Sequence, residues 1–75
     1  MDKNDIGTNA GVIWHLLADN GALNIREIGE HTHWREACIF LALGWLAREN
    51  KINFLEKDDA MYIELNDSHF SEIYY

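Results

Sequence analysis

The pattern of apolar and polar positions is clearest between residues 35 and 50, where it predicts one long helix. At about 100° per residue, the apolar side chains of this helix divide into two sets on nearly opposite sides: Ile39, Ala42, Leu43 and Leu46, and then Cys38, Leu41 and Trp45. The first set suits the core of a small domain. The second set is not needed for that core, so what covers it is the main functional question that the sequence raises.

A first helix is predicted over residues 9 to 19, because apolar residues recur there at helical spacing: Ile6, Ala10, Ile13, Trp14 and Leu17. Thr8 or Asn9 supplies a capping oxygen at its start, and residues 1 to 8 are expected to be less ordered. Asn20 and Gly21 end the helix, since both tolerate positive φ. The regular spacing assigns Trp14 to the core.

A second helix is predicted over residues 25 to 31. Asn24, followed by Glu27 three residues later, has the form of a capping box, and residues 22 to 24 before it are long enough only for an extended bridge. Gly29 and the segment 31 to 33 interrupt the periodicity and end the helix.

Alternating side chains in residues 51 to 55 and 61 to 65 predict a β-hairpin with a polar tip at residues 56 to 59. Its apolar face is expected to lie on the helices and to consist of Ile52, Phe54, Met61, Ile63 and Leu65. Residues 66 to 75 are left unassigned, although three of them recur at helical spacing and could cover the second side of the long helix: Phe70, Ile73 and Tyr74.

The order helix, short strand, helix, helix, strand, strand predicts an α+β winged helix-turn-helix domain, with three helices and a two- to three-stranded wing, over residues 1 to 75. The segment LALGWLARENKI at residues 41 to 52, with AGVIW at residues 10 to 14, resembles a small family of stand-alone bacterial winged helix-turn-helix proteins without an assigned function. The resemblance implies the fold and no particular activity. Asn50 stands where the family pattern usually has Gly, and Asn also adopts the left-handed conformation of a helix end.

Composition and charge narrow the class of protein. The 75 residues, 48% of them hydrophobic, fit one globular domain. A domain of this size buries only about 60% of its unfolded surface, so its core is thin and oligomerisation is a common remedy. Thirteen acidic and six basic residues give a net charge of −7, which opposes binding to a phosphate backbone. With one cysteine, no secretory signal and no apolar run of membrane-spanning length, we expect a cytoplasmic protein.

A DNA-binding role is the less favoured interpretation. If the long helix entered the major groove, the positions facing the bases would be residues 37, 38, 41, 44, 45 and 48, which offer almost no hydrogen bonds to base edges. The tip of the wing is acidic where lysine or arginine would favour DNA. In this alternative, a transcriptional regulator would bind as a dimer, and its phosphate contacts would come from Arg26, Arg35, Arg48 and Lys51.

The favoured interpretation is a small regulator or adaptor that acts through protein contacts, including a homodimer. The expected interface is the second side of the long helix: Cys38, Leu41, Trp45 and Arg48. The competing possibility is that the wing or the C-terminal residues cover this side within one chain.

His31, His33 and Cys38 match no zinc spacing, and Cys38 has no identifiable catalytic base, so we expect no metal, cofactor or enzymatic activity.

Overall fold

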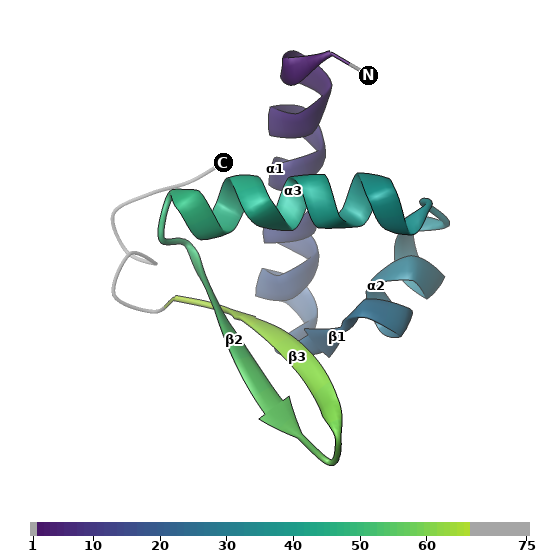
Figure 1. The fold of residues 1–75 in the computed structure, drawn as a ribbon, viewed down its shortest axis with the longest axis vertical. Helices are drawn as coiled ribbons and strands as arrows, with labels where there is room; N and C mark the ends of the chain where they lie inside the picture. The colour runs from purple at the N-terminus through teal and green to yellow at the C-terminus, as the bar shows by residue number, and fades with distance from the viewer. Residues whose placement is uncertain (1, 67–75) are drawn as a thin grey trace.

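A computed structural model describes residues 2–66, which form three helices and three strands. The first elements are α1 (Lys3–Asn20), β1 (Leu23–Asn24) and α2 (Ile25–Thr32). They are followed by α3 (Glu36–Arg48), β2 (Ile52–Lys57) and β3 (Ala60–Leu65). Figure 1 shows α3 crossing α1, with the β2–β3 hairpin, the wing, extending away from the helices. The predicted winged helix-turn-helix architecture is confirmed. The competing possibility that Phe70, Ile73 and Tyr74 cover α3 concerns residues outside the described range.

The three strands form one antiparallel sheet in the order β1-β3-β2. The expected extended bridge before α2 is a two-residue strand, in which Leu23 pairs with Ile63 of β3. On the other side of β3, Phe54 of β2 pairs with the same Ile63, which places all three side chains on one face of the sheet. The short strand thereby ties the start of α2 to the wing.

The hydrophobic core lies where α1, α2 and the base of the sheet meet the inner side of α3. All four residues predicted for that side are buried, and Trp14 is only 6% exposed, as its helical spacing predicted. The described residues contain no buried polar or charged side chain. The complete core comprises Ala10, Ile13, Trp14, Leu17, Leu23, Ile28, Ile39, Ala42, Leu43, Leu46, Ile52 and Ile63.

The first helix begins earlier than predicted, because residues 3–8, which were expected to be less ordered, are part of α1. Asp2, not Thr8 or Asn9, is the N-cap: its carboxylate accepts a hydrogen bond from the backbone N–H of Asn4 at 3.2 Å. The Asp5 carboxylate accepts one from the backbone N–H of Asp2, also at 3.2 Å. These bonds satisfy N–H groups that a helix start leaves unpaired, and so they add about a turn and a half to α1.

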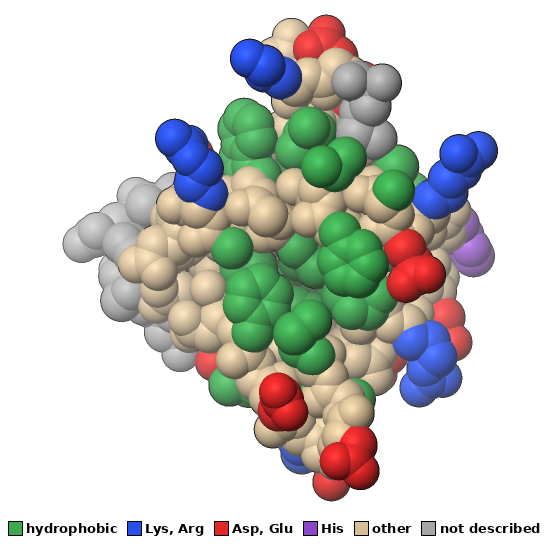
Figure 2. All heavy atoms as spheres, viewed as in Figure 1, with side chains coloured by type: hydrophobic (Ala, Val, Ile, Leu, Met, Phe, Trp, Pro, Cys, Tyr) green, Lys and Arg blue, Asp and Glu red, His purple; other side chains and the backbone are tan. Residues whose placement is uncertain are grey.

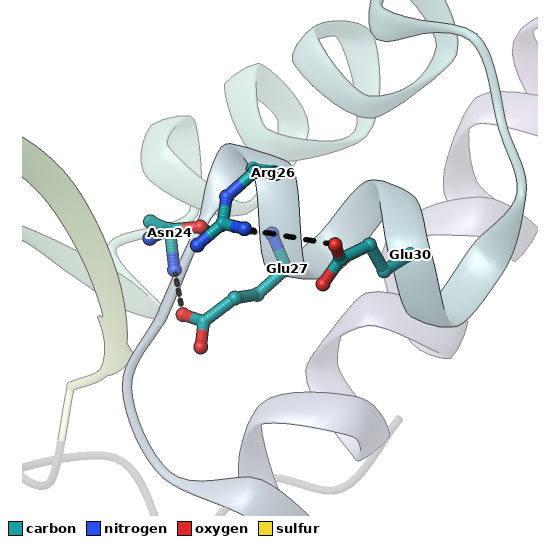
Figure 3. A network of polar contacts seen from close by, with 4 residues as sticks. All are labelled: Asn24, Arg26, Glu27 and Glu30. Carbon is teal, nitrogen blue, oxygen red and sulfur yellow. Dashed lines mark hydrogen bonds and ion pairs between the residues drawn. The ribbon is translucent and has the colours of Figure 1, made fainter.

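The predicted capping box of α2 is present (Figure 3). The Asn24 side chain accepts from the backbone N–H of Glu27 at 2.8 Å, and Glu27 accepts from the backbone N–H of Asn24 at 3.0 Å. The helix ends at Thr32, one residue later than expected, and His33 follows in the left-handed conformation with φ of 61°. Local side-chain chemistry therefore sets both ends of this helix.

The end of α3 also follows the prediction from Asn50, whose φ is 59°. Its N–H donates to the carbonyl of Ala47, and the N–H of Lys51 donates to the carbonyl of Leu46 at 2.9 Å. This pair of bonds is the Schellman motif, which requires a residue in the left-handed region. Asn66 holds the base of the wing to this corner, because its side chain donates to the carbonyl of Asn50.

The wing differs from the prediction in its turn. The strands extend to Lys57 and from Ala60, so the connection has two residues rather than the four expected. Both of these residues, Asp58 and Asp59, have positive φ, of 53° and 63°. A two-residue hairpin turn of this handedness matches the twist of the strands, and Asp is one of the residues that tolerate it.

Replacing Ile28 by Ala tests the core. Ile28 is fully buried, so its truncation leaves a cavity and is expected to lower the free energy of unfolding by about 2–5 kcal/mol. Val12→Ala is the control, because Val12 is 45% exposed and its change should stay within about 0.5 kcal/mol. Urea denaturation followed by circular dichroism measures both. Equal losses in the two variants would contradict this placement of the core.

Candidate protein-interaction surface

The four residues predicted as an interface lie along one side of α3, which we call the Trp45 flank: Cys38, Leu41, Trp45 and Arg48. Leu41 is 47% exposed and Trp45 is 36% exposed, while Cys38 is partly buried and Arg48 is exposed. The helix therefore presents an apolar side to its surroundings, although the side is partly covered.

Part of the cover comes from α1. A Cβ atom built on Gly7 would stand 3.3 Å from Cζ2 of Trp45, so the indole ring lies directly against the backbone of Gly7. This contact exists because α1 begins at Lys3, and it was missed when residues 1 to 8 were expected to be loose. The available signal was the pair Asp2 and Asp5, in which aspartate takes the place of the usual glutamate at the third helical position.

A second exposed apolar group was not predicted as a site. It consists of Phe40 on the other side of α3 and of Phe54 and Met61 on the wing, with exposures of 48%, 48% and 41%, and we call it the Phe40 flank. Phe54 and Met61 were expected to be covered by the helices, which is wrong. Ile52 at the start of β2 and Ile63 on the central strand β3 are buried. Phe54 lies on the edge strand β2, and Met61 lies nearer the turn, where the hairpin projects beyond the helices (Figure 1).

The two flanks are separated by the outermost ridge of α3. Phe40 and Leu41 are neighbours in sequence, so they point about 100° apart around the helix axis. Between them lie Ala37 and Gly44, which have little or no side chain. In the space-filling view, hydrophobic side chains gather above and below α3 on the same face of the molecule (Figure 2). The surface is thus a wide apolar area divided by a narrow ridge.

The four residues considered for phosphate contacts do not form one basic surface. Arg26 on α2 forms an exposed ion pair with Glu30 at 3.7 Å (Figure 3), and Lys51 after α3 pairs with Glu49 at 3.4 Å. Arg35 and Arg48 lie at opposite ends of α3. The wing turn itself consists of Asp58 and Asp59, and Glu56 and Lys57 precede it, so acidic side chains outnumber basic ones at the tip.

His31, His33 and Cys38 are not grouped as a metal site. His31 and His33 are exposed at the end of α2, and Cys38 is partly buried on α3. Within residues 2–66, no group of three or more His, Cys, Asp or Glu side chains is placed to hold a metal ion.

The order of elements, with α2 and α3 as the helix pair and β2–β3 as the wing, defines the class: a winged helix-turn-helix domain. The chain belongs to the family described as Winged helix-turn-helix domain (DUF2582), whose family model matches residues 1–65.

Two proteins illustrate what this chain is similar to. The chain is 38% identical over 60 residues to the uncharacterized protein MJ1608 of Methanocaldococcus jannaschii, covering 77% of this chain and 84% of that protein. It is also similar to the solution NMR structure of protein BT2368 from Bacteroides thetaiotaomicron, with 36% identity and a TM-score of 0.79. That match covers 100% of this chain and 90% of the other. Over the described residues, none of the helices has the length and hydropathy needed to cross a membrane.

Two glycine substitutions test the packing around Trp45. A Cβ on Gly44 would meet no heavy atom of residues 2–66 within 4 Å, so Gly44→Ala should raise the free energy of unfolding by about 0.5–1 kcal/mol through helix propensity alone. Gly7→Ala should gain less, because its Cβ would press on the Trp45 ring. Urea denaturation at low protein concentration compares the variants. A larger gain at Gly7 would show that the ring does not lie there.

Proposed function

We propose that this winged helix domain acts through protein contacts, including self-association through the Trp45 flank, as a small regulator or adaptor. The observation that carries the proposal is the chemistry of the exposed side of α3. In DNA-binding members of this class the second helix of the pair enters the major groove, and its exposed side chains read the base edges. Here that side presents Phe40, Leu41, Trp45 and the bare backbone of Gly44.

The energetics favour a modest interface. Burial is worth about 25 cal/mol for each Å² of apolar surface, and Leu41 retains about half of its exposure while Trp45 retains about a third. Because Trp45 is already covered in part by Gly7, only its remaining surface contributes to association. Loss of translational and rotational freedom offsets much of the gain. We therefore expect a dissociation constant in the micromolar range, not the nanomolar range.

From the apolar exposed side of α3 we predict that the protein has no measurable affinity for duplex DNA at physiological salt. Non-specific affinity comes almost wholly from neutralised phosphates, and the net charge of −7 works against it. A fluorescence anisotropy titration with a labelled duplex measures this directly. Saturable binding at micromolar protein that weakens steeply with added salt would favour the alternative, a DNA-binding transcriptional regulator that binds as a dimer.

Self-association is tested with Leu41→Lys. A lysine on the Trp45 flank should give a folded monomer under conditions in which the wild type associates, because a charged group would have to be buried in the apolar interface. Leu55→Lys is the matched control: Leu55 is 40% exposed but pairs with Tyr62 on the face of the wing opposite to Phe54. Sedimentation equilibrium up to about 100 μM gives the masses, and circular dichroism confirms folding.

A wild type that stays monomeric over that range would overturn the proposed self-association, since an interface with micromolar affinity would be nearly saturated there. Trp45→Glu is less informative than Leu41→Lys. Its ring also packs on Gly7, so removing it would change the stability of the monomer as well as the interface.

A further inference from the structure

The Phe40 flank has an acidic rim. Glu36 lies one helical turn before Phe40 on α3, and both are exposed. On the wing, Glu56 pairs directly with Met61 and follows Phe54 by two residues, so these three side chains share one face. In Figure 2, acidic side chains stand to the right of and below the hydrophobic group below α3, with a basic side chain farther to the lower right. A partner for this flank should therefore combine apolar side chains with positive charge.

The Trp45 flank has such a combination. Arg48 follows Trp45 by three residues on α3 and is exposed. Lys3 lies one turn before Gly7, the residue on which the Trp45 ring rests. Basic side chains accordingly flank the hydrophobic group above α3 (Figure 2). The acidic residues at this end, Asp2 and Asp5, are engaged in the capping box of α1.

We propose that the Trp45 flank of one copy binds the Phe40 flank of a second copy. The inference rests on the proposed self-association and specifies which surfaces meet. Two like flanks packed together would face charges of the same sign across the contact, Lys3 and Arg48 on one flank or Glu36 and Glu56 on the other, and the copies would repel each other. Unlike flanks bring opposite charges to the rim of an apolar contact.

A two-fold axis allows this contact to occur twice in one closed dimer, because each copy carries both flanks. The ridge between the flanks then lies near the axis. Gly44 suits that position, since no heavy atom of residues 2–66 lies within 4 Å of a Cβ built there, and its bare backbone permits close approach of the second copy.

Phe54→Glu tests which surfaces meet. If the Phe40 flank takes part, this variant should weaken association at least tenfold, although Phe54 lies on the wing and away from Leu41. Leu55→Glu is the matched control, one residue away on the opposite face, and should associate like the wild type. Sedimentation measures association, and circular dichroism confirms that both variants fold.

Charge reversal gives a second test that depends less on folding. Arg48→Glu and Glu56→Arg should each weaken association about threefold to tenfold, as expected for charges at the rim of an interface. An equimolar mixture of the two variants should recover the wild-type affinity, because each mixed pair again places opposite charges together at both contacts. The mixed species can be followed by labelling one variant with a fluorophore.

The results of these experiments distinguish the contact between unlike flanks from self-association in general. If Leu41→Lys abolishes association while Phe54→Glu and Glu56→Arg leave it unchanged, the Trp45 flanks pack on each other; self-association then stands and the inference fails. If the wild type is monomeric at about 100 μM, both fail. Loss of association in Phe54→Glu with recovery in the mixture supports the contact between unlike flanks.

Discussion

The structure depends on the packing of one helix side, the inner side of α3, against everything else in the domain. Ile39, Ala42, Leu43 and Leu46 are at most 3% exposed, and α1, α2 and the base of the sheet all close around them. In a domain this small there is no second core to compensate if that contact is lost. The caps and turns place the surrounding elements so that this one apolar side is covered.

Covering one side of α3 leaves the rest of its circumference exposed, and in this chain that part is apolar. The capping box at Asp2 lets α1 reach Trp45, which partly shields one flank. The other flank stays open, because Phe40, Phe54 and Met61 are 41% to 48% exposed. A winged helix fold determines where α3 sits but not what it binds. The exposed side chains of α3, rather than the fold, set the chemistry of what that helix can contact.

Local chemistry could be read from the sequence with good accuracy. Helical spacing identified the inner side of α3 and the buried Trp14. The Asn24 and Glu27 pair predicted the start of α2, and Asn50 predicted the left-handed end of α3. Each of these features depends on residues within a few positions of each other, where backbone geometry leaves few alternatives. The order of such elements was enough to give the fold.

Only the tertiary structure decided the burial and the contacts that depend on residues far apart in the chain. Alternation correctly placed Phe54 on the same face as Ile63, and the two residues pair directly. Ile63 is buried because β3 is the central strand, with β1 on its other side, whereas Phe54 lies on the edge strand β2 and is 48% exposed. The ring of Trp45 likewise found its partner in Gly7, 38 positions earlier (45 − 7 = 38). Periodicity determines the side of an element on which a residue lies, while its burial depends on which other element covers that side.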